Sequence, residues 1–247
     1  MTEHPSAAAR DFGPTEELPP SSGAADDHSL VGRRNRLQTA KEWLLSGGSV
    51  LFFGMVGVGK SAAVDVITVA AVQPRVLRCA SVEGEAGQAF SALAGLLSSI
   101  TAAELDSVPA ARRRVLLAVM NDDVESVAPV AVRLAALNLI RVLARSRPLL
   151  LIVDDLQWVD EASSDVLRFV ASRVEDLPVQ MAAAERVAPD CLPLRRGLCP
   201  PPLLVVRLDA VTPTGLPEQP RRGSPGMGPG LLPPKRGTDR VSVTVST

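Results

Sequence analysis

Residues 49–61 read SVLFFGMVGVGKS, and this stretch decides the fold. The apolar run Val50–Phe53 predicts a buried strand, and a helical pattern begins at Lys60. Between them, Gly54–Ser61 matches GxxxxGK followed by serine or threonine, in which glycines let successive backbone N–H groups curl round a phosphate chain. The helix that follows brings the partial positive charge of its N-terminus to the same anion. A strand, a glycine-rich loop and a helix in this order predict a phosphate-binding loop.

The loop predicts a site for ATP with Mg²⁺. Lys60 is expected to reach the β and γ phosphates, and the Ser61 hydroxyl is expected to ligate Mg²⁺. A glycine-rich turn that binds nothing is the alternative, and the lysine and serine at the expected positions argue against it. The loop residues expected to bind the nucleotide are Gly54, Gly57, Val58, Gly59, Lys60 and Ser61.

A second stretch, Leu149–Asp155, is an apolar run that ends in two carboxylates. Such a run reads as a strand buried on both faces, and ligands of open parallel sheets bind at the strands' carboxyl ends. Asp154 is expected to hold Mg²⁺ through water. Asp155 is expected to orient or deprotonate the attacking water, with a turn or capping acid as the alternative.

Two further charged residues, Arg186 and Asp160, lie next to predicted elements. Arg186 comes just after the strand predicted at Val179–Ala183, where its guanidinium could contact the γ-phosphate. An exposed arginine paired with Glu185 or Asp190 is an equally good interpretation. Asp160 is expected to cap the helix that follows it.

Strands alternate with helices along the chain, which predicts an α/β fold with a parallel sheet of about five strands, covered by helices on both faces. Helices are expected over residues 34–45, 60–71, 89–97 and 130–144. The predicted strands are Ser49–Phe53, Val76–Cys79, Leu149–Val153, Val179–Ala183 and Leu203–Val206.

The two ends of the chain differ from its middle. Residues 1–28 lack helical or strand periodicity and predict a disordered leader, while residues 212–247 are dense in proline and glycine and predict a disordered tail. One domain is therefore expected, over residues 29–211.

Composition excludes several classes of function. A net charge of −1 gives no basic stripe for nucleic acid, and three cysteines with two histidines make no zinc pattern. No uninterrupted apolar run approaches the length of a membrane-spanning helix, so we expect a cytoplasmic protein that binds no membrane.

Three segments together resemble the ATPase domain of large LuxR-type transcriptional regulators, which belong to the STAND class of AAA-related signalling ATPases. They are residues 30–33 (LVGR), the phosphate-binding loop and residues 154–160 (DDLQWVD). The resemblance implies that Gly32 and Arg33 help to enclose the nucleotide. This chain departs from the family in having Arg36, where an acidic residue is usual before Leu37.

The resemblance also implies a function, an ATP-binding signalling module that hydrolyses ATP slowly and works in a homo-oligomer or with a protein partner. Family members continue into a helical lid, a winged-helix region, a sensor array and a helix-turn-helix, none of which residues 212–247 can form. A truncated gene product or a shifted reading frame would explain this tail, and no direct DNA binding is expected. The alternatives are a non-catalytic, nucleotide-bound interaction module and a non-functional fragment. A small-molecule kinase would need an arginine-rich lid, which the sequence does not offer.

Overall fold

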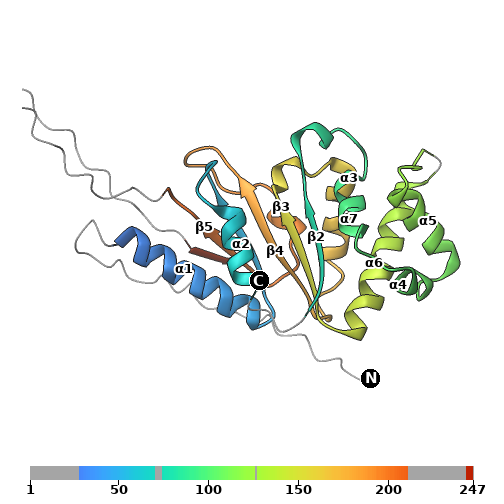
Figure 1. Cartoon of the computed structure of the whole chain (residues 1–247), viewed down its shortest axis with the longest axis horizontal. Coiled ribbons are helices and arrows are strands. Elements are labelled where there is room, and N and C mark those ends of the chain that lie inside the picture. Colours follow the sequence, from blue (N-terminus) through green and yellow to red (C-terminus); the bar gives the residue numbers. More distant parts are fainter. Residues whose placement is uncertain (1–27, 70–73, 126, 211–242, 247) are drawn as a thin grey trace, which may run out of the picture.

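The computed structural model describes residues 28–69, 74–125, 127–210 and 243–246 (Figure 1). Its strands and helices alternate as the sequence predicts. The strands are β1 Ser49–Gly54, β2 Arg75–Ala80, β3 Leu149–Asp154, β4 Val179–Arg186, β5 Leu203–Arg207 and β6 Val243–Ser246. The helices are α1 His28–Leu45, α2 Lys60–Thr68, α3 Ser91–Leu97, α4 Ala102–Asp106, α5 Ala110–Met120, α6 Pro129–Ser146 and α7 Glu161–Ala171.

The sheet has the order β2-β3-β4-β1-β5-β6. The first five strands are parallel, as predicted, and β6 pairs with β5 in the antiparallel direction. Strand β4 lies between β1 and β3, with Val50 opposite Ala182 and Ile152 opposite the same alanine. The carboxyl ends of β1, β4 and β3 therefore meet at one edge of the sheet, with β4 in the middle.

Helices cover both faces of the sheet, α1 and α2 on one and α3, α6 and α7 on the other (Figure 1). The pleat of β1 explains the division, because successive side chains point to opposite faces. Val50 and Phe52 pack with Ile67 of α2, whereas Leu51 and Phe53 pack in the other core cluster. A strand buried on both faces explains why residues 50–53 are all apolar.

Several boundaries differ from the predictions for local reasons. Helix α1 begins at His28, six residues before the predicted start, and ends at Leu45 because Gly47 takes a φ of 103°. Helix α3 begins at Ser91 because Phe90 is left-handed, with a φ of 65°. Helices α4 and α5 were not among the predicted elements.

The predicted leader, apart from His28, lies outside the described residues, as do residues 212–242 and Thr247 of the predicted tail. Residues Val243–Ser246, which the sequence analysis assigned to a disordered tail, form β6 instead. Their alternating valines explain this strand, because β-branched residues favour extended backbone. None of the described helices is long and apolar enough to cross a membrane.

Candidate functional site

The loop between β1 and α2 is shaped by glycines at left-handed backbone angles. Gly57 has a φ of 78° and Gly59 a φ of 77°, which L side chains rarely adopt. Gly54 is constrained further, because a Cβ there would lie 2.3 Å from the carbonyl oxygen of Leu208. The backbone thus keeps the curled form that phosphate binding needs.

Lys60 begins α2 and is only 8% exposed. Its Nζ donates to the carbonyl oxygens of Gly54, at 3.1 Å, and Met55, at 2.7 Å. Burial lowers the pKa of Lys60; the negative charges of Asp155 and Asp154 oppose this shift, and the positive charge of Arg186 adds to it. An ammonium group in these surroundings gains from an anion placed against it.

The acidic half of the site lies at the end of β3. Asp154 is buried, and its Oδ1 accepts a hydrogen bond of 3.0 Å from the backbone N–H of Asp155. Asp155 is half-buried and left-handed, with a φ of 54°. Ser61 lies exposed in the first turn of α2. The Ser61 hydroxyl and the Asp154 carboxylate are oxygen donors of the kind that Mg²⁺ prefers, so the residues present fit the predicted cation.

Arg186 is the last residue of β4 and is exposed. It lies at the carboxyl end of β4, between the loop that follows β1 and the acidic half that follows β3. Its positive charge is near enough to Lys60 to lower the pKa of that lysine. Neither predicted acidic partner pairs with it among the described residues. Glu185 accepts from the backbone N–H groups of Leu194 and Arg195 instead, and Asp190 lies 3.7 Å from Arg207.

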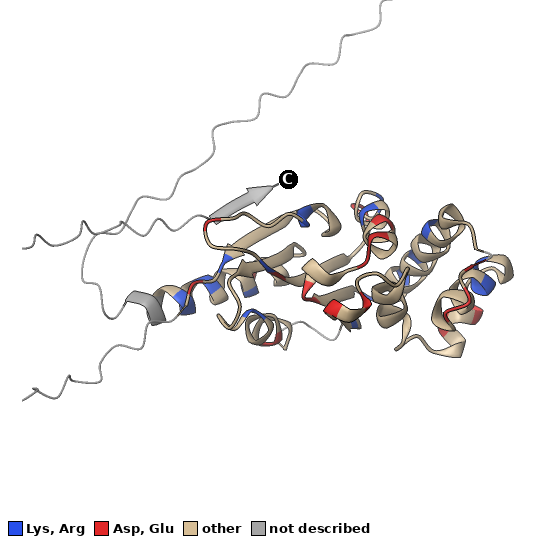
Figure 2. Cartoon of the chain, turned by 90° about the horizontal axis from the view of Figure 1, so that it is seen from above, with Lys and Arg blue, Asp and Glu red and all other residues tan. Residues whose placement is uncertain are grey.

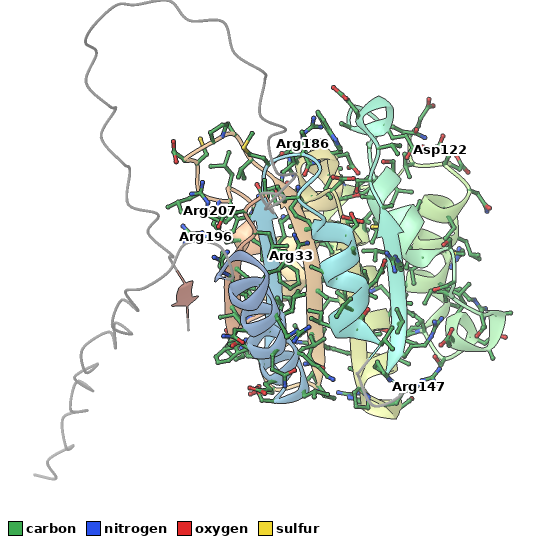
Figure 3. The ribbon with its side chains drawn as sticks, turned by 60° about the vertical axis from the view of Figure 1, so that its left-hand side comes forward. Arg33, Asp122, Arg147, Arg186, Arg196 and Arg207 are labelled. Carbon is green, nitrogen blue, oxygen red and sulfur yellow. The ribbon has the colours of Figure 1, made fainter. Side chains whose placement is uncertain are left out.

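Helix α1 supplies contacts from a distant part of the chain. The Arg33 Nη2 donates to the carbonyl oxygen of Gly59 at 3.2 Å, so Arg33 contacts the loop, whereas a Cβ added at Gly32 would meet no atom within 4 Å. Arg36 donates to the Arg207 carbonyl at 2.8 Å and to Asp209 Oδ2 at 3.0 Å. Figure 2 shows basic residues, coloured blue, along α1, and Figure 3 shows Arg33 below the end of the sheet that carries Arg186.

A hollow of about 210 Å³ adjoins the loop on the side of β5. Its walls are mainly apolar or backbone. They come from residues 54, 55 and 58 of the loop region, 187 and 188 after β4, and 207–210 at the end of β5 and just after it. Sequence reasoning missed Val187 and Leu208 as wall residues, because only the sheet order brings the ends of β4 and β5 to the loop.

Two side chains organise the segment after Asp155. Asp160 caps α7, as predicted, by accepting from the backbone N–H of Ser163, and it also accepts from Phe90 and Ala92 at the start of α3. Gln157, which the sequence analysis did not single out, bonds Asp155 Oδ1 at 2.8 Å. An amide two residues beyond the paired carboxylates was the one sequence signal for this contact.

A parallel α/β sheet with this loop after β1 and a carboxylate pair after β3 defines a P-loop NTPase. The chain belongs to the AAA ATPase domain family, whose model matches residues 29–182. Membership of this family indicates nucleotide binding, and the roles of the individual site residues stay predictions.

Solved structures similar to this chain include that of the Aeropyrum pernix Orc1 protein in complex with DNA, with 14% identity and a TM-score of 0.43, covering 73% of this chain and 46% of that chain. Cdc6p from Pyrobaculum aerophilum has 16% identity and a TM-score of 0.39, covering 76% of this chain and 48% of that one. This chain thus spans under half the length of either. Among curated proteins, none matches it.

Proposed function

We propose that this domain binds Mg-ATP at Gly54–Ser61 and hydrolyses it slowly, as the nucleotide-responsive module of a LuxR-type signalling regulator. The observation that carries the proposal is the buried ammonium of Lys60, held by two loop carbonyls beside the charges of Asp154, Asp155 and Arg186. A desolvated cation in a cradle of left-handed glycines favours phosphate oxygens over water. The relation to LuxR-type regulators rests on residues 30–33 and 154–160.

Each residue of the site has a distinct role in this proposal. The loop N–H groups and Lys60 bind the β and γ phosphates, and Ser61 with Asp154 holds Mg²⁺. Bound Mg²⁺ supplies neutralising charge to the phosphates. Asp155 orients the attacking water, and Arg186 balances charge on the γ-phosphate. The hollow beside the loop takes the nucleoside, because its walls are mainly apolar and include Gly54.

Slow turnover follows from the exposure of the catalytic cation. Arg186 is open to solvent, where water and salt screen its charge and weaken its hold on the γ-phosphate. An arginine fixed in a dry site accelerates phosphoryl transfer by roughly 10³ to 10⁵, and an exposed one supplies only part of this gain.

Calorimetric titration with Mg-ATP tests the binding proposal. Lys60→Ala is expected to weaken binding about tenfold to a hundredfold, the loss typical of a hydrogen bond to a charged group. Lys41→Ala, on the half-buried part of α1, is the matched control and should leave the affinity unchanged. Equal affinities of the wild type and Lys60→Ala would show that the nucleotide binds elsewhere. If ATP binds and is never cleaved, the domain is a nucleotide-bound interaction module instead.

A further inference from the structure

The side-chain amide of Gln157 joins two strand ends of the site. Its Nε2 donates to Asp155 Oδ1 at 2.8 Å, and its Oε1 accepts the backbone N–H of Arg186 at 2.7 Å. The orientation of the amide is determined by its partners, because the Arg186 N–H can only donate and an ionised carboxylate can only accept. Gln157 therefore connects the end of β3 to the end of β4 in one defined way.

The turn that carries Gln157 is anchored on both sides. It is a 3-10 turn, Leu156–Trp158, in which the Trp158 N–H donates to the Asp155 carbonyl at 2.9 Å. Leu156 and Val159 are buried in the core, and Asp160 binds the next segment to α7 and α3. A turn fixed in this way holds the amide in place rather than letting it follow the carboxylate.

The end of β4 is also bonded to the phosphate-binding loop. The Val187 N–H donates to the Gly54 carbonyl at 3.2 Å, and the same carbonyl accepts from Lys60 Nζ. A continuous series of contacts thus runs from Lys60 through Gly54 and the end of β4 to Gln157 and Asp155. These contacts fix the position of the Asp155 carboxylate relative to the loop that would hold the γ-phosphate.

We infer that Gln157 is a positioning residue, which aims Asp155 at the attacking water by fixing its carboxylate to the end of β4. Gln157 donates to Oδ1, and among the described residues no protein group is bonded to Oδ2, which leaves this oxygen for the water. This inference rests on the proposed ATP hydrolysis and adds to it the residue that orients the base.

Single-turnover hydrolysis, ATP titration and thermal melting of Gln157→Met and Gln157→Glu test the inference. Methionine removes both bonds, and glutamate keeps the acceptor for Arg186 while it sets an oxygen against Asp155. Both variants are expected to slow hydrolysis about tenfold to a hundredfold, as a displaced catalytic group does, with the ATP affinity within about twofold. Gln88→Met is the matched control, because Gln88 makes an exposed bond of the same kind to Asp122.

Combination with Asp155→Asn separates positioning from a purely structural role. In that background Gln157→Met should have no further effect on the rate, because there is no carboxylate left to aim. Asp155→Asn should also restore the melting temperature that Gln157→Glu lowers, because the new amide can donate to the new carboxylate. Multiplicative rate losses, or a wild-type rate in both Gln157 variants, would overturn the inference and leave the proposed function intact. A wild-type protein that cleaves no ATP would overturn both.

Discussion

The two halves of the site are built by different means. The loop Gly54–Ser61 is shaped mainly by its own backbone, through left-handed glycines and the bonds of Lys60 to Gly54 and Met55. The acidic half at Asp154 and Asp155 is held by side chains further along the chain, Gln157 and Asp160, which bond to β4 and α3. A loop shaped by its own backbone can be predicted from a local sequence motif, whereas contacts between distant elements can hardly be predicted from the sequence. The first two predictions perturb one half at a time.

Gly54→Ala should have the largest effect on stability. The added Cβ would lie 2.3 Å from the Leu208 carbonyl oxygen, at a residue with a φ of 154°. The combined backbone strain and overlap should lower the free energy of unfolding by about 3–4 kcal/mol. Gly57→Ala meets open space at its Cβ and should cost only about 1 kcal/mol in the same urea titration. Equal losses would show that packing against β5 does not shape the loop.

Asp160→Ala should have the next largest effect, on the acidic half. Its carboxylate accepts from three backbone N–H groups, those of Phe90, Ala92 and Ser163, and two helix starts lose their cap together. We expect a loss of about 2–3 kcal/mol in the free energy of unfolding. Asp165→Ala, which breaks only an exposed ion pair with Arg168 on α7, should change stability by less than about 0.5 kcal/mol. A similar change in both variants would contradict the double cap.

Glu104 lies outside both halves of the site, so a change there should alter the stability of the fold without altering the site. Its contribution to stability should depend on pH. Hydrogen bonds from Arg75 lower the pKa of Glu104 from 4.5 to about 2. A carboxyl whose pKa is lower in the folded state stabilises the fold above its unfolded pKa, and this stabilisation is lost as the pH falls towards 2. Glu104→Gln should therefore cost about 1–2 kcal/mol at neutral pH, after allowance for solvent screening.

Acid-unfolding curves of the two proteins check this prediction. The difference between wild type and Glu104→Gln should shrink steadily below pH 4.5, the ordinary pKa of the group. Nucleotide binding should stay unchanged at neutral pH, because Glu104 lies in α4, which Figure 1 shows well apart from α2 and the loop before it. A stability difference that is constant from neutral pH to pH 2 would show that the charge of Glu104 contributes nothing.

Much of the fold could be predicted from the sequence, because the parallel strands are mainly apolar and the four after β1 each begin directly after a proline. Pro148 before β3 and Pro178 before β4 mark strand starts that the structure has. The capping role of Asp160 was equally local and is confirmed. The family membership follows from the loop and from Asp154 with Asp155, whose spacing and context are specific.

The contacts between strand ends could not be predicted, since they depend on β4 lying between β1 and β3. Arg36 shows this most plainly, because it bonds Asp209, a residue far along the chain that only β5 brings near α1. Gln157 is a second case, since its partner Arg186 lies on the neighbouring strand. Strand β6 adds a third, because its pairing with β5 joins residues that are far apart in the sequence.

Single-turnover hydrolysis of labelled ATP by the wild type and Asp155→Asn tests the central claim that the loop and the acidic half act on one nucleotide. The account predicts a wild-type rate well below the usual enzyme range of roughly 1 to 10³ per second. It also predicts that Asp155→Asn slows cleavage by more than about tenfold, while the ATP dissociation constant changes little. Cleavage at the same rate in both proteins would contradict the account, because Asp155 would then be no more than a turn residue.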